Sequence, residues 1–217
     1  MFDAVTARRM MVDGQIRTAN VTDLDLIAAM LAVPRERFVP ASLAAQAYCD
    51  GEIAIAAHRV LLKPMVLAKL IQAAGVGRTD HVLDVGCGTG YGSAVLARLA
   101  GSVVALEQDE DLARQSKAAL AATGDGCIAT VTGPLTAGWP VAAPYDVILL
   151  NGATEITPEI LGQQLKPSGR LACIFGRGPT GKAVLYREIE GRLVGRPAFD
   201  SAAPLLPGFA APPAFVF

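Results

Sequence analysis

The second half of the chain alternates between short apolar runs and amphipathic segments. Apolar runs of strand length occupy residues 81–86, 102–107, 127–132, 145–150 and 169–175. Segments with helical periodicity occupy residues 91–100, 109–124 and 157–165. Buried strands that alternate with helices are typical of a parallel sheet covered on both faces. The pattern therefore predicts an α/β fold built on these five strands, with a further pair of strands within residues 182–195.

The first third of the chain has helical rather than strand periodicity. Helices are predicted at residues 3–17 and 23–32, in part of 35–48, and at 64–75, where Pro64 begins the helix and Gly75 ends it. Residues 51–64 lack a clear period and are compatible with short strands or an extended loop. We therefore predict a helical cap over residues 1–75 that packs on an α/β domain of residues 76–217, as one compact unit.

Composition and charge exclude several classes of function. The 19 basic and 20 acidic residues leave a net charge of −1, so no strong field attracts nucleic acid or an anionic membrane. The sequence shows neither an uncharged apolar run long enough to span a membrane nor the apolar core of a secretory signal. The four cysteines lie far apart, which argues against a zinc site. We expect a cytoplasmic protein without a metal.

The main chemical signal is the sequence LDVGCGTGYG at residues 83–92, which has a glycine at every second position from Gly86 to Gly92. A dinucleotide-binding loop needs the spacing G-x-G-x-x-G, and no register of this segment supplies the third glycine. A phosphate-binding P-loop needs a lysine, and residues 81–97 contain neither lysine nor arginine. Both nucleotide motifs are therefore excluded.

The spacing that does fit is acid-x-G-x-G-x-G, formed by Asp84, Gly86, Gly88 and Gly90. Together with Glu107 at the end of the next strand, it resembles the S-adenosylmethionine loop of Rossmann-like methyltransferases. Glu107 follows the loop at about the 20-residue interval at which an acid on the second strand reaches a ribose. A carboxylate there can accept hydrogen bonds from both ribose hydroxyls, and Asp84 would suit the positive charge of the ligand's ammonium group.

Further segments extend the resemblance across most of the chain. They lie at residues 33–40 (VPRERFVP), 46–50, 63–70, 82–99, 143–153 and 161–171. They follow one another as in the protein-L-isoaspartate (D-aspartate) O-methyltransferases. The resemblance implies the class I methyltransferase fold with an N-terminal helical extension. It also implies methyl transfer from S-adenosylmethionine to the α-carboxylate of isoaspartyl residues in damaged proteins. Because that carboxylate is already ionised at pH 7, the reaction needs positioning rather than a base.

The resemblance also implies where the cofactor binds. The positions are Asp84, Gly86, Cys87, Gly88, Gly90, Glu107, Gln108, Pro134, Leu135 and Asn151. Cys87 is interpreted as a small buried residue rather than a nucleophile, because no base lies near it in the sequence. Asn151 is predicted to end its strand, where it could face the methyl donor or the acceptor, or bond its own turn.

Two segments depart from the family pattern. The family's substrate loop reads Thr-Ile-Ser-Gln-Pro, whereas this chain has, in the same order, Val60, Leu61, Leu62, Lys63 and Pro64. Leu62 cannot replace the serine hydroxyl near the acceptor carboxylate. The family's Gly-Asp-Gly, whose acid helps to hold the adenine amine, is here Gly133, Pro134 and Leu135.

These departures leave the catalytic residues open. Lys63 could supply a cation for an acidic acceptor, or it could simply begin a surface helix. The alternatives to isoaspartyl methylation are transfer to another carboxylate or to a small molecule, and a catalytically weak module that keeps the cofactor fold as a scaffold.

Overall fold

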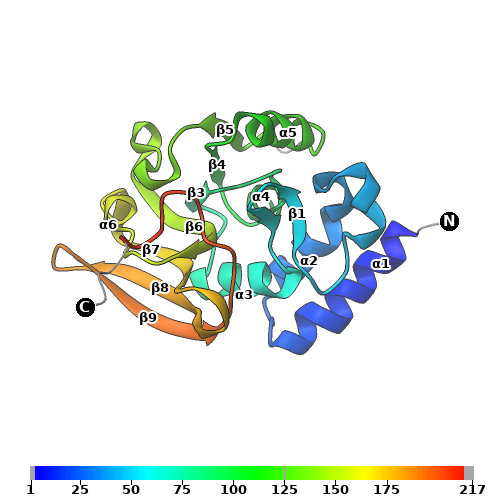
Figure 1. Ribbon diagram of the computed structural model, residues 1–217, viewed down its shortest axis with the longest axis horizontal. Helices are drawn as coiled ribbons and strands as arrows, with labels where there is room; N and C mark the ends of the chain where they lie inside the picture. The colour runs from blue at the N-terminus through cyan, green and yellow to red at the C-terminus, as the bar shows by residue number, and fades with distance from the viewer. Residues whose placement is uncertain (1–2, 125, 213–217) are drawn as a thin grey trace.

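The centre of the protein is a seven-stranded sheet with the strand order β5-β4-β3-β6-β7-β8-β9. The computed structural model describes residues 3–124 and 126–212 (Figure 1). The strands are β3 His81–Val85, β4 Ser102–Glu107, β5 Ile128–Thr132, β6 Tyr145–Thr154, β7 Leu165–Phe175, β8 Lys182–Ile189 and β9 Arg192–Asp200. Strands β5, β4, β3, β6 and β7 are parallel, and β8 and β9 are antiparallel. The predicted α/β class is confirmed.

The helices that cover the sheet begin and end at residues that favour helix termini. They are α3 Pro64–Ala74, α4 Tyr91–Ala97, α5 Glu110–Ala121 and α6 Glu159–Gly162. Asp109 caps α5, since its side chain accepts from the backbone N–H groups of Asp111 and Leu112. The helix predicted over residues 157–165 is only the single turn α6, because strand β7 already begins at Leu165.

The N-terminal region is helical, but it is divided into short pieces. They are α1 Ala4–Met11, a π-helical turn at Val12–Ile16, a 3-10 turn at Arg17–Ala19, α2 Leu24–Ala32, and 3-10 turns at Arg35–Phe38 and Ala41–Gln46. The helix predicted over residues 3–17 is present as an unbroken helical stretch from Ala4 to Ala19, in which the hydrogen-bond pattern changes from α to π at Val12 and to 3-10 at Arg17. Gly14 lies inside the π turn, and glycine weakens a regular helix at that place. Figure 1 shows α1 and α2 at the opposite end of the molecule from β8 and β9.

Residues 51–64, which the sequence leaves undecided, contain a β-hairpin. Strand β1 (Ile53–Ala56) pairs antiparallel with β2 (Arg59–Leu61) in a separate two-stranded sheet. His58 lies in the turn with a φ of 57°. The hairpin lies near α4 in Figure 1, and the side chain of Ile55 reaches the glycine loop that precedes this helix.

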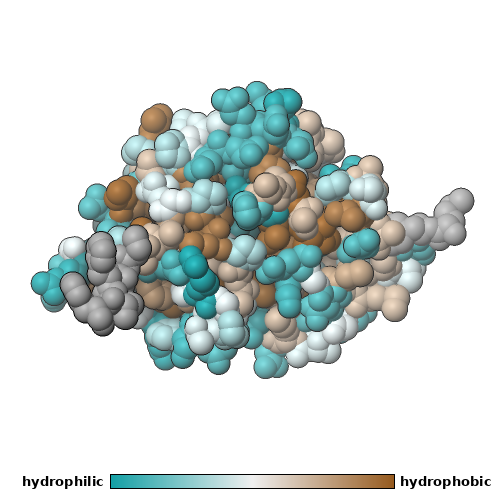
Figure 2. All heavy atoms as spheres, in the orientation of Figure 1, coloured by the Kyte–Doolittle hydropathy of each residue, from teal (hydrophilic) through white to brown (hydrophobic). Residues whose placement is uncertain are grey.

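The segment after β9 returns across the sheet. Leu206 donates its backbone N–H to the carbonyl of Ala153 at 2.9 Å, and Ala153 donates to the carbonyl of Pro204 at 2.8 Å. Figure 1 shows this red segment passing in front of β6. Hydrophobic residues gather in the middle of the same face in Figure 2, with hydrophilic ones around them. None of the helices among the described residues has the length and apolar character needed to cross a bilayer.

Candidate cofactor and methyl-transfer site

The glycine loop joins β3 to α4 at the carboxyl edge of the parallel strands, where α/β sheets bind their ligands. Gly86, Gly88 and Gly90 have φ values of +73°, +59° and +97°, which side-chain-bearing residues rarely adopt. A Cβ atom on Gly88 would lie 2.6 Å from Cδ1 of Ile55. The loop therefore requires glycine both for its backbone conformation and for the close approach of its neighbours.

Glu107 ends β4 beside this loop, and its side chain is fully buried. Its carboxylate accepts two hydrogen bonds from the guanidinium of Arg59, at 2.6 and 2.7 Å. It also accepts from the backbone N–H groups of Gly88 at 2.8 Å, Gln108 at 2.8 Å and Asp109 at 3.1 Å. These donors fix the carboxylate at the place where the sequence predicts ribose recognition.

Arg59 is a residue of this site that the sequence did not reveal. It lies on β2, is 6% exposed, and donates from Nη2 to the carbonyl of Gly86 at 3.1 Å as well as to Glu107. Its guanidinium therefore connects the glycine loop to the acid. The one available signal was an arginine in a largely apolar segment, and the sequence does not indicate which acidic residue it pairs with.

Asp84 lies at the inner side of the loop, and its side chain is fully buried. Ser93 donates its hydroxyl to Oδ2 of Asp84 at 2.5 Å, and Asn151 donates its side-chain amide to Oδ1. Burial raises the pKa of Asp84 to about 7, although the hydrogen bonds from Ser93 and Asn151 oppose the shift. In this structure the carboxyl group is thus held by the protein's own side chains.

Asn151 lies inside its strand, since β6 continues to Thr154. The prediction that Asn151 ends the strand was therefore wrong. The pairing of β6 with β7 is irregular between Leu149 and Ala153, and the side chain of Asn151 bonds to Asp84 rather than to its own turn.

The raised pKa of Asp84 predicts a specific pH dependence of stability. Between pH 4 and 7 the folded protein keeps a proton that the unfolded chain loses, so the free energy of unfolding falls as the pH rises. We expect this contribution to reach up to about 4 kcal/mol and to be absent in Asp84→Asn. Urea unfolding of both proteins at several pH values measures the difference. Parallel pH profiles of the two proteins would contradict the assignment.

A buried arginine connects the VPRERFVP segment to the glycine loop and to the β2–α3 connection. Arg35 is fully buried and donates to the carbonyl oxygens of Ala47 and Leu62, each at 2.7 Å. Its guanidinium lies 4.7 Å from the ring centre of Tyr91, and Phe38 packs edge-on against the same ring at 5.7 Å. Burial lowers the pKa of Arg35. This cluster therefore sets the path of residues 60–64 relative to α4.

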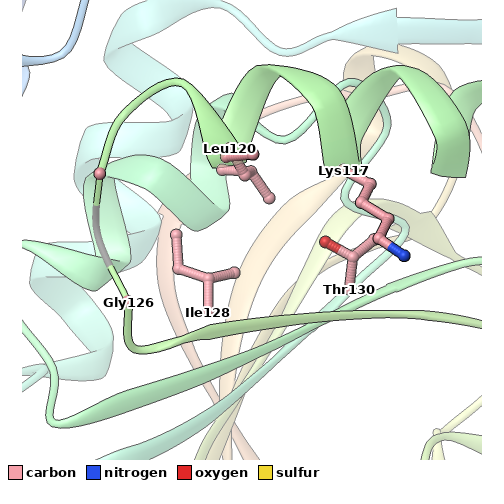
Figure 3. A pocket seen from close by; sticks show the side chains of 7 residues that line it. Lys117, Leu120, Gly126, Ile128 and Thr130 are labelled. Atoms are coloured by element: carbon pink, nitrogen blue, oxygen red, sulfur yellow. The ribbon is translucent and has the colours of Figure 1, made fainter.

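A separate hollow of about 380 Å³ lies between α5 and β5 (Figure 3). It is lined by Lys117, Leu120, Ala121, Gly124, Gly126, Ile128 and Thr130. None of these residues belongs to the glycine loop or contributes a carboxylate. The hollow therefore does not form part of the predicted cofactor site.

Comparison with known proteins identifies the family. The sequence model described as Protein-L-isoaspartate(D-aspartate) O-methyltransferase (PCMT) matches residues 6–194. A protein-L-isoaspartate O-methyltransferase of Methylorubrum extorquens (strain PA1) is 41% identical over 199 residues, which cover 92% of this chain and 85% of the relative. This chain belongs to the protein-L-isoaspartate(D-aspartate) O-methyltransferase family. The family and fold predicted from the sequence are confirmed.

Solved structures agree with membership of this isoaspartate methyltransferase family. A protein-L-isoaspartate O-methyltransferase superposes with a TM-score of 0.79 at 25% identity, over 93% of this chain and 66% of its own. A Plasmodium falciparum protein described as a member of the family, in complex with S-adenosyl-L-homocysteine, also has a TM-score of 0.79. It is 19% identical, over 92% of this chain and 97% of its own, and so supports the fold alone.

Residues 60–64 are the segment that the sequence analysis aligns with the family's substrate loop. Leu61 and Leu62 are 6% and 3% exposed and pack in the hydrophobic core. Lys63 precedes α3 at its N-cap position and is partly exposed, while Pro64 begins the helix. That residues 60–64 flank the acceptor stays a prediction, and the structure places the Leu62 side chain in the interior.

The predicted adenine side, residues 133–135, lies beside the end of β4. Gly133 donates its N–H to the backbone carbonyl of Glu107 at 3.1 Å, so the segment lies directly beside the end of β4. Pro134 is exposed and Leu135 is fully buried. The ring of Trp139 lies 3.3 Å from the position of a Cβ on Gly133. Apolar groups therefore surround the segment that the sequence analysis assigns to the adenine.

Cys87 and the histidine that begins β3 have structural roles. Cys87 is buried, and burial raises its pKa well above the usual value, so it is not prepared as a nucleophile. The ring nitrogens of His81 contact the hydroxyl of Ser102 at 2.7 Å and the carbonyl of Ala142 at 2.9 Å. Among the described residues, no group of three or more histidine, cysteine or acidic side chains is arranged to bind a metal.

Proposed function

We propose that this protein is an S-adenosylmethionine-dependent methyltransferase that methylates the α-carboxylate of isoaspartyl residues in damaged proteins. The observation that carries the proposal is the buried carboxylate of Glu107, which backbone N–H groups hold at the end of β4 beside the glycine loop. Family membership over residues 6–194 supports the same activity.

The residues at this edge fit the cofactor in their chemistry. Glu107 would accept hydrogen bonds from the ribose hydroxyls. Gly86 and Gly88 have positive φ angles that favour glycine, and because glycine has no Cβ atom, the ligand could approach the loop backbone closely. Leu135 and Trp139 would provide an apolar side for the adenine ring. When bound, the cofactor supplies an activated methyl group on a sulfonium. Arg59 already donates two hydrogen bonds to the carboxylate of Glu107. The cofactor therefore fits only if this ion pair opens.

The acceptor needs little chemical activation from the protein. A carboxylate with a pKa of about 4 is ionised at neutral pH, so no general base is required. The part of this chain is to hold the acceptor in line with the methyl group and to keep water away from it. This agrees with a site whose two buried carboxyl groups, Asp84 and Glu107, are already engaged in hydrogen bonds.

A second candidate is methyl transfer to a different carboxylate or to a small molecule. The observation that favours it is Leu62, which lies where the family has the serine that approaches the isoaspartyl carboxylate. Lys63, which is partly exposed beside it, would provide a cation for an acidic acceptor of either kind.

The two candidates differ in one transfer experiment. We expect the wild type to transfer labelled methyl to an isoaspartyl peptide and not to the matching aspartyl peptide. We expect Leu62→Ser to be about tenfold faster than Leu62→Ala, which is the gain from one hydrogen bond to a charged group. Leu62→Ala is the matched control, because both variants leave a similar cavity in the core. Cofactor binding without transfer by any of the three proteins would contradict isoaspartyl methylation.

A further inference from the structure

We propose that Arg59 is a latch on the cofactor site, closed in the free protein and displaced when the cofactor binds. The inference rests on the proposed function, because it concerns the same carboxylate, that of Glu107. It assigns to Arg59 control over whether that carboxylate is available.

The first argument is the number of hydrogen bonds that Glu107 can accept. A carboxylate has about four acceptor positions, and the described residues already donate five hydrogen bonds to this one. Three of the donors are backbone N–H groups of the loop and of the β4–α5 turn, which cannot leave without local unfolding. Ribose hydroxyls can therefore be accepted only if the guanidinium of Arg59 withdraws.

The second argument is that Arg59 is not the only group of its hairpin in the site. Ile55 lies on the neighbouring strand β1, and its Cδ1 atom is 2.6 Å from the point where a Cβ atom on Gly88 would lie. Nη2 of Arg59 is 3.4 Å from the point where a Cβ atom on Gly86 would lie. One hairpin thus covers both the glycine loop and the acid.

The third argument is that the guanidinium of Arg59 can withdraw without disturbing the central sheet. Strands β1 and β2 have four and three residues and form a sheet of their own, apart from the seven-stranded one. Withdrawal of the Arg59 side chain therefore leaves the ladders of the central sheet intact, while Ile53 and Leu61 stay in the core. Because the closed form cannot bind the cofactor, the apparent affinity is lowered in proportion to the fraction of open molecules.

Isothermal titration with S-adenosylhomocysteine, which has no methyl group to transfer, tests the latch. We expect Arg59→Gln to bind at least tenfold more tightly than the wild type. Arg78→Gln is the matched control, since Arg78 pairs with Asp25 on the surface and its side chain is 75% exposed. This control is expected to bind like the wild type. A folded Arg59→Gln protein that binds equally or more weakly would overturn the latch and leave the proposed function intact.

Amide hydrogen exchange of the wild type provides a test that needs no variant. S-adenosylhomocysteine is expected to speed exchange in residues 53–61 while it slows exchange in the glycine loop. Slower exchange in both segments would overturn the latch, because Arg59 would then still anchor the hairpin when the ligand is bound. If neither the wild type nor Arg59→Gln binds the compound, the latch and the proposed function both fall.

Discussion

Glu107→Ala is expected to lower the free energy of unfolding by about 4 kcal/mol or more. The substitution leaves the guanidinium of Arg59 buried without its counter-charge, and breaking one side of a buried ion pair costs about 3–5 kcal/mol. It also removes the acceptor of three backbone N–H groups, those of Gly88, Gln108 and Asp109. Urea unfolding in the absence of cofactor measures the loss, so the result does not depend on any activity.

A double-mutant cycle separates the ion pair from the other contacts of Glu107. Arg59→Ala, Glu107→Ala and the double variant are unfolded under the same conditions. We expect the double variant to be more stable than the sum of the two single losses implies, by about 1–3 kcal/mol, because no unpaired charge remains buried in it. Additive losses would show that the two side chains contact each other without energetic coupling.

Arg35→Met is expected to lower the free energy of unfolding by about 3 kcal/mol. Methionine keeps much of the apolar volume, but it leaves the carbonyl groups of Ala47 and Leu62 without their donor, at about 1–3 kcal/mol for each unsatisfied group. It also removes the cation that lies over the ring of Tyr91. Urea unfolding measures this change as well.

The matched control for Arg35 is Arg78→Met, which removes an arginine whose side chain is 75% exposed. We expect this variant to stay within about 0.5 kcal/mol of the wild type. If Arg35→Met proves equally mild, the buried guanidinium does not hold the connection between β2 and α3, and another contact must set the path of residues 60–64.

Much of the fold could be predicted from the sequence, because its elements have strong local signals. Apart from Asp84, residues 82–85 are apolar, and residues 103–106 are apolar throughout, as buried parallel strands require; both predicted strands are present. The predictions failed where local signals conflict with long-range contacts. The helix expected at residues 157–165 is cut short, since the backbone carbonyl of Gln164 accepts from Tyr145 at 2.8 Å as the chain enters β7.

The candidate site divides in the same way. The glycine loop and Glu107 could be predicted as site residues, because an acid about 20 residues after such a loop ends the second strand. Arg59 lies 48 positions before Glu107, and no interval in the sequence connects them. Asn151 lies 67 positions after Asp84, within the part of β6 whose pairing with β7 is irregular.

The sequence by itself determined the α/β class and the family, and it predicted the loop and the acid that the cofactor would use. These features depend on periodicity and spacing, which are properties of short segments. Only the tertiary structure decided that Arg59 forms an ion pair with Glu107 and that the side chain of Leu62 lies in the core. Both outcomes depend on how a hairpin near residue 55 packs against a loop near residue 88, and the contacts that decide such packing lie far apart along the chain.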